Sequence, residues 1–269
     1  CATGTWYRAG EGLIGSWMAL IAYAFTSAAT KYGLLLPLMD GVNKPTNVNT
    51  SMSQTTGIPT WIWVILLTVI TVFFVVKTLR KPKPKFAVPK LKQKFTGVRH
   101  YLFEKKYHPF VAAIAVGLIA LIAWPVSEST GRMYGLGITT PSANLVQFFV
   151  TGDLKLLDWG VFLVLGIFLG SYLAARGARE FKWRLPDKKT IRNSVIGGVF
   201  MGFGASVAGG CSIGNGLVET ATMSWKGWIA LASMILGAWT MSYFVFIRPM
   251  KKAQKQTSNE NVTSQTQTI

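Results

Sequence analysis

The hydrophobic residues of this chain lie in long uninterrupted blocks and not at helical or strand intervals. Each block carries almost no charge and is close to the roughly 20 residues that a membrane-spanning helix needs. The blocks cover residues 13–29, 58–76, 110–126, 159–175, 193–217 and 228–247. The pattern predicts an all-α polytopic membrane protein with about six membrane segments.

The composition agrees with this prediction, because half of the 269 residues are hydrophobic and only 14% are charged. The formal net charge is nevertheless +18. Most of the 28 Lys and Arg residues fall in residues 77–108, 176–192 and 248–255, which hold eleven, seven and four of them. Basic clusters of this kind are typical of cytoplasmic loops. The charge therefore indicates topology, and we do not expect a nucleic-acid partner.

The two cysteines mark an internal repeat. Cys1-Ala-Thr-Gly4 matches Cys211-Ser-Ile-Gly214, and Trp17-Met-Ala-Leu matches Trp228-Ile-Ala-Leu further along. A glutamate, Glu11 or Glu219, lies between cysteine and tryptophan in both copies. The basic clusters orient the two copies oppositely, so we expect pseudo-symmetric inverted repeats, a common transporter design.

These observations divide the chain into four parts. Residues 1–76 form the end of the first repeat with the Cys1 motif, and residues 109–247 form the second repeat with the Cys211 motif. Between them, residues 77–108 form a basic cytoplasmic loop, and residues 248–269 form a disordered cytoplasmic tail. Since the chain begins at Cys1 without a methionine or a signal peptide, we interpret it as a fragment that lacks N-terminal helices.

The segment "GGVFMGFGASVAGGCSIGNGL" places many glycines inside a membrane block. Its first half has small residues at helical spacing, which let another helix approach closely: Gly198, Gly202, Ser206 and Gly210. Its second half is too rich in glycine for a stable helix. Irregular backbone at membrane depth is tolerated only against protein or water, so we expect a break followed by a short half-helix.

The free N–H groups of a half-helix favour an anion. Gly209, Gly210 and Gly214 would let the backbone approach a small solute, and Cys211 would offer a soft sulfur contact. The alternative is that Cys211 is a small buried apolar residue.

Charged residues near membrane segments are a second set of candidates, because burying them is costly. The pairs expected from sequence proximity are Arg8 with Glu11, Arg132 with Glu128, and Lys226 with Glu219. Each pair has a structural and a functional interpretation. Arg132 is the best candidate for attracting an anion from outside. His100 and His108 have no partners at metal-ligand spacing, so we expect no metal site, no cofactor and no catalytic residue.

The segments "CATGTWYRAGEGL", "STGRMYGLGITTP" and "GFGASVAGGCSIGNGL" resemble the YeeE/YedE family of sulfur-transport membrane proteins. The resemblance implies an hourglass-shaped inner-membrane protein of a bacterium, in which membrane-embedded cysteines pass thiosulfate. Its expected partners are thiosulfate or a similar sulfur anion, the lipid bilayer and a cytoplasmic sulfur-carrier protein. The candidate passage residues are Cys1, Gly4, Arg8, Glu11, Arg132, Gly209, Gly210, Cys211, Gly214, Asn215 and Glu219.

Three alternatives stay open from the sequence. A membrane redox protein could use the two cysteines as a dithiol, which requires their α-carbons to lie within about 7 Å of each other. A structural subunit could use the small-residue faces for assembly. A permease of the same family could carry selenium compounds or other sulfur oxyanions.

Overall fold

The computed structural model describes residues 1–42, 51–80, 107–132, 134–251 and 254. Most of the basic loop and of the polar tail lies outside these residues. Regular structure in the described part is helical, apart from two isolated β-bridges. The helices are α1 (Ala2–Gly10), α2 (Ile14–Tyr32), α3 (Leu36–Val42), α4 (Met52–Thr56), α5 (Thr60–Arg80), α7 (Pro109–Ser129), α8 (Thr139–Thr151), η1 (Leu154–Leu156), α9 (Trp159–Gly177), α10 (Lys188–Val207), η2 (Gly214–Glu219), α11 (Trp225–Ser242) and η3 (Tyr243–Ile247).

Each of the six predicted blocks overlaps one long helix. In order, these helices are α2, α5, α7, α9, α10 and α11. Four of them, α5, α7, α9 and α11 with its continuation to Lys251, are long and apolar enough to cross a membrane. The expectation of an all-α polytopic membrane protein is therefore confirmed.

The long helices differ in what surrounds them. α5 and the spanning window of α11 bury no residue inside the protein, as expected for helices whose side chains face lipid. α2, in contrast, packs along α10. A Cβ added to Gly198 would lie 2.5 Å from the carbonyl oxygen of Ala19, and one added to Gly202 would lie 2.6 Å from that of Tyr23. The small-residue face of α10 thus lets α2 approach closely, as predicted.

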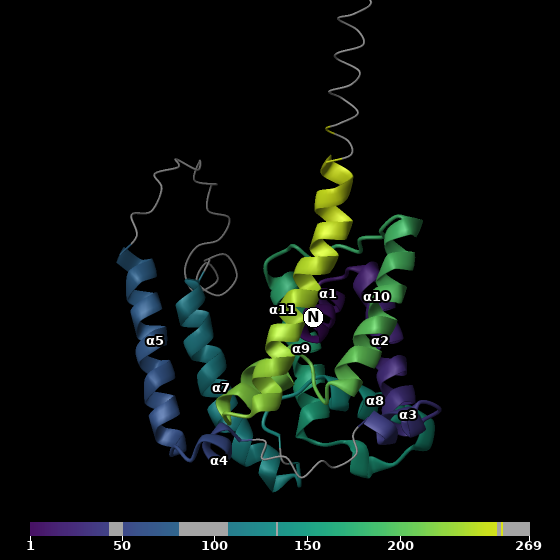
Figure 1. Ribbon diagram of the computed structural model, residues 1–269. Coiled ribbons are helices and arrows are strands. Elements are labelled where there is room, and N and C mark those ends of the chain that lie inside the picture. Colours follow the sequence, from purple (N-terminus) through teal and green to yellow (C-terminus); the bar gives the residue numbers. More distant parts are fainter. Residues whose placement is uncertain (43–50, 81–106, 133, 252–253, 255–269) are drawn as a thin grey trace, which may run out of the picture.

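The basic ends of the helices lie on one side of the molecule. Figure 1 shows the C-terminal ends of α5 and α11 at the top, together with the N-terminal ends of α7 and α10. Arg80, Lys188 and Lys251 belong to these ends. The described parts of the three basic clusters therefore lie on one face of the molecule, as the charge pattern predicts.

The two cysteine motifs have the same local architecture. Each cysteine precedes a short helix, a tight turn follows, and a long helix comes next: α1 and α2 after Cys1, residues 212–221 and α11 after Cys211. The turns contain positive φ angles at Gly12 and Met223. Isolated bridges pair the turns with distant chain, Leu13 with Arg184 and Ser51 with Ser224. The repeat is thus visible as helix–turn–helix units, while the inverted orientation, the hourglass and the four-part division stay predictions.

Candidate functional site

The expected helix break lies directly before Cys211. α10 ends at Val207, and Gly209 has a φ of +72°, a conformation that side chains rarely adopt. The Asn215 side chain closes the break, since its Nδ2 donates to the carbonyl oxygens of Ala208 (3.2 Å) and Gly210 (2.9 Å). The glycines therefore permit the turn and Asn215 satisfies the carbonyls that it frees.

Cys211 begins the half-helix that follows the break. The backbone N–H of Asn215 donates to the carbonyl of Cys211 at 2.9 Å, which leaves the N–H groups of the preceding residues without an intrahelical acceptor. Residues 214–219 then form the π-helical stretch η2, and such stretches are frequent at functional sites. The Asn215 Oδ1 is buried and has no partner among the described residues.

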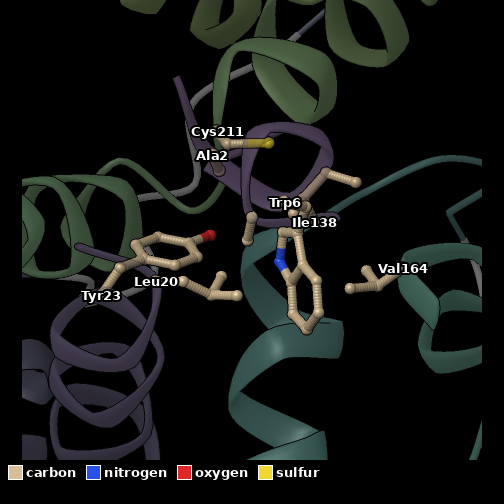
Figure 2. Close-up of a cluster of buried hydrophobic side chains, with 8 residues drawn as sticks. Ala2, Trp6, Leu20, Tyr23, Ile138, Val164 and Cys211 are labelled. Carbon is tan, nitrogen blue, oxygen red and sulfur yellow. The ribbon is translucent and has the colours of Figure 1, made fainter. Parts of the chain in front are cut away.

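The Cys211 side chain is 6% exposed and belongs to the main apolar core. Figure 2 shows this core as side chains from several elements, among them Trp6 of α1, Tyr23 of α2 and Val164 of α9. Burial alone agrees with the interpretation of Cys211 as a small apolar residue. However, Cys211 also lines a cavity on each of two sides, which a purely structural apolar residue does not require.

Cys1 occupies the equivalent position before α1. The N–H of Thr5 donates to its carbonyl at 3.0 Å, as Asn215 does for Cys211. The Cys1 Sγ lies 3.2 Å from the Ser212 Oγ, the hydroxyl next to Cys211. Both thiols are free. The starts of the two short helices therefore meet, although they are 211 residues apart in sequence.

Three cavities follow one another, and each neighbouring pair shares one of the two cysteines as a lining residue. The arginine cavity, about 220 Å³, is bordered by Arg132, Gly209 and Cys211. The apolar cavity, about 620 Å³, lies between α10 and α11 and is bordered by Cys211 and Cys1. The N-terminal cavity, about 490 Å³, is bordered by Cys1, Gly4 and Arg8. Each cysteine thus lines two of the three cavities.

The cavities lie at different heights along the helices. The N-terminal cavity includes Ser16 near the start of α2 and Ser194 near the start of α10, on the side where the basic ends gather (Figure 1). The arginine cavity includes Asp158 at the start of α9 and residues that follow the C-terminal end of α7, which lies on the opposite side (Figure 1). The three cavities therefore follow one another along the long axes of the membrane helices.

The N-terminus of α8 forms one wall of the arginine cavity. Thr139 and Thr140 line it, and α8 is held there by the Tyr23 hydroxyl, which donates to Thr139 Oγ1 at 2.9 Å. Trp6 Nε1 donates to Ser142 Oγ at 3.0 Å. Sequence reasoning did not include these threonines. The Thr-Thr-Pro run, which is typical of a helix start, could have indicated them.

Arg132 lines the arginine cavity but not with its expected partner. Its guanidinium pairs with Asp158 at 3.2 Å, so the prediction of a pair with Glu128 is wrong. The Asp158 carboxylate also accepts the N–H of Val161 at 3.0 Å and caps α9. A Cβ added to Gly160 would lie 1.5 Å from Arg132 Nη1. The missing side chain at Gly160 therefore gives the guanidinium its place against α9.

Glu219 lies across the same cavity. It pairs with Lys226 at 3.8 Å, as predicted, and accepts a hydrogen bond from the Tyr134 hydroxyl at 2.9 Å. Burial and the hydrogen bond to this carboxylate raise the pKa of the Tyr134 phenol. The hydroxyl consequently remains a donor. A Cβ added to Gly209 would lie 2.6 Å from Lys226 Nζ, so the break and the ion pair are in contact.

The structure divides the predicted site residues among three places. Cys1, Gly4 and Arg8 lie on the N-terminal cavity, and seven others lie on the arginine cavity: Arg132, Gly209, Gly210, Cys211, Gly214, Asn215 and Glu219. Glu11 lies apart, in a cavity of about 530 Å³ with Glu180 and Arg184. No ion pair joins Arg8 to Glu11 within the described residues. The Arg8 guanidinium lies over the Tyr7 ring at 5.9 Å.

Comparisons with known proteins give consistent matches. A family model described as sulphur transport matches residues 1–240. The chain is 55% identical to the thiosulfate transporter TsuA of Escherichia coli (strain K12), over 97% of this chain and 74% of the relative. It is 32% identical to the thiosulfate transporter TsuA of Spirochaeta thermophila, over 92% of this chain and 73% of the relative. The probable transporter YedE of Escherichia coli (strain K12) is 25% identical over 55% of this chain and 40% of the relative.

Proposed function

Because the chain belongs to the sulphur transport family, we propose that it carries thiosulfate through a bacterial inner membrane by way of Cys211 and Cys1. The observation that carries this proposal is the series of three cavities, in which each cysteine borders two neighbours. In this proposal, a solute that moves from the arginine cavity to the N-terminal cavity passes both cysteines.

The arginine cavity has the chemistry of an anion entrance. Bringing a dianion into a medium of low dielectric constant is costly unless donors and dipoles replace its water. The N-terminal ends of α8 and of the half-helix after Cys211 both border the cavity, and their free N–H groups favour negative charge. These groups would replace part of the water that thiosulfate loses.

The cysteines in this proposal work as neutral thiols. A thiolate would repel a dianion, whereas an S–H group donates a weak hydrogen bond. Weak contacts suit conduction, because a site must release its ion as readily as it captures it. Thiosulfate then leaves unchanged, and the protein acts as a transporter and not as an enzyme. A cytoplasmic sulfur-carrier protein would receive the sulfur compound on the inner side.

The orientation is part of the proposal. The basic ends gathered on one side (Figure 1) support a cytoplasmic C-terminus by the rule that positive loops stay inside. In intact cells that make a variant without other reactive thiols, a cysteine at Lys155 should react with an impermeant thiol reagent, and one at Lys188 should not. Labelling at position 188 from outside would reverse the orientation.

The dithiol alternative, which requires the two α-carbons to lie within about 7 Å of each other, stays open. Both thiols are free, and the Cys1 Sγ faces the Ser212 hydroxyl.

The experiment that tests the proposed function is growth of a cell deficient in sulfate uptake on thiosulfate alone, with the complete protein supplied. Growth that depends on the protein supports thiosulfate transport. Absence of growth, with the protein present in the membrane, would contradict it.

A further inference from the structure

The arginine cavity gathers an unusual share of the basic residues outside the three basic clusters. Six such residues occur in the chain, and three of them come to this cavity or its wall: Arg132, Lys226 and Lys31. Two are neutralised there. Arg132 pairs with Asp158 and Lys226 pairs with Glu219. Lys31 is the third, and its surroundings differ.

Lys31 lies in the last turn of α2, behind the N-terminus of α8. Its Nζ donates to Thr140 Oγ1, and Thr140 lines the arginine cavity. The side chain is half-buried. Among the side chains that the structure describes, which do not include that of Asp40 in α3, no carboxylate pairs with it.

Charges that are balanced in pairs contribute little net field at a cavity, whereas an uncompensated charge at its wall contributes directly. Within this set of described groups the two ion pairs balance, and Lys31 adds one positive formal charge. Lys31 is positioned by a threonine in the first turn of α8, so its charge adds to the N-terminal dipole of that helix.

We propose that Lys31 is a specificity-determining residue, which supplies a positive charge beside the arginine cavity that draws thiosulfate into it. This inference rests on the proposed thiosulfate transport. It assigns the role to a residue in the last turn of α2 that is not among the candidates predicted from the sequence.

A purely structural role for Lys31 makes different forecasts. Lys31 and its neighbour Tyr32 both bind α8, since the Tyr32 hydroxyl donates to Asn144 Oδ1. If the pair only fastens α2 to α8, Tyr32→Phe and Lys31→Met should have similar effects on stability and transport. If Lys31 acts by charge, Tyr32→Phe should leave the KM for thiosulfate unchanged.

The experiment measures uptake of radiolabelled thiosulfate by proteoliposomes that contain the complete protein. Lys31→Met should raise the KM about tenfold, the effect of weakening an electrostatic contact by roughly 1.4 kcal/mol, with little change in the maximal rate. Lys31→Arg should restore most of the affinity, because it keeps the charge. Lys155→Met, which removes an exposed lysine elsewhere on the chain, is the matched control and should have the wild-type KM.

Two results would overturn the inference while thiosulfate transport stands. One is an unchanged KM in Lys31→Met, and the other is an equal rise in KM in Tyr32→Phe. If the wild-type protein transports no thiosulfate, the proposed function fails. Equilibrium binding of labelled thiosulfate to the detergent-purified protein then tests the role of Lys31 separately. Weaker binding by Lys31→Met than by the wild type would support the inference. Equal binding by the two proteins would overturn it.

Discussion

Cys1 and Cys211 stand at equivalent positions of two similar motifs but in unequal surroundings. Each is the residue before a short helix, and each has its carbonyl bound by the N–H four residues later. Cys211 is buried in the apolar core, whereas Cys1 is exposed. The local sequence therefore determines that a short helix follows each cysteine, and the tertiary contacts determine how deeply that cysteine is buried.

The residue four positions after each cysteine shows the same contrast. Asn215 uses its side chain to bind two carbonyls at the break. Thr5 only donates its hydroxyl back to the carbonyl of Cys1. The Cys211 motif must satisfy a backbone that has been broken inside the membrane, and this requirement explains the asparagine. The two motifs can be compared experimentally through such matched positions.

Among the variants that compare the two motifs away from the cysteines themselves, the largest effect is expected at the break. A Cβ on Gly210 would lie 3.2 Å from Asn215 Oδ1, so Gly210→Leu should force the asparagine from its carbonyls and push a large side chain toward the cavity. We expect thiosulfate uptake to fall at least tenfold, which corresponds to about 1.4 kcal/mol, with normal amounts of protein in the membrane. Gly237→Leu on α11 is the control, since nothing lies within 4 Å of the added Cβ. Normal uptake by Gly210→Leu would show that the glycines are not at the passage.

A smaller effect should separate Asn215 from Thr5. Asn215→Ala removes the donor of two carbonyls and should lower the free energy of unfolding by roughly 1–3 kcal/mol, the cost of leaving buried polar groups unpaired. Thr5→Val removes one exposed hydrogen bond and should cost less than about 1 kcal/mol. Thermal unfolding of the detergent-purified variants measures the difference. Equal losses would mean that the break is not held by the asparagine.

The smallest effect is expected where the two motifs touch. Ser212→Ala removes the hydroxyl that faces the Cys1 sulfur at 3.2 Å. If this contact only orients the Cys1 thiol, uptake should fall a few-fold, in line with the roughly 0.5–1.5 kcal/mol of one hydrogen bond. Initial uptake rates at saturating thiosulfate provide the measurement. A complete loss would instead assign Ser212 a direct part in the passage.

Much of this arrangement could be predicted from the sequence. The apolar blocks indicated the long helices, because about 20 residues are needed to cross a bilayer. Small residues at helical spacing indicated the close approach at Gly198 and Gly202, and glycine density indicated the break near Gly209. These features are local, and local patterns record them directly.

The contacts between distant segments could not be predicted in this way. Glu128 was the expected partner of Arg132 because it is near in sequence, whereas the fold brings Asp158 to the guanidinium and Gly160 leaves room for it. Lys31 was not recognised because its contact with Thr140 joins two helices 109 residues apart. The partners of the charged residues around the arginine cavity are therefore set by the tertiary fold, and spacing along the sequence does not predict them.

The central claim is that thiosulfate passes Cys211 as a neutral thiol. Uptake of radiolabelled thiosulfate by proteoliposomes with the complete protein tests it most directly. Cys211→Ala should abolish uptake with folding and membrane insertion intact, and Cys211→Ser should retain at most a fraction, because a hydroxyl is a harder and more strongly hydrated contact than a thiol. Undiminished uptake by Cys211→Ala would contradict the account and leave Cys211 as a buried apolar residue.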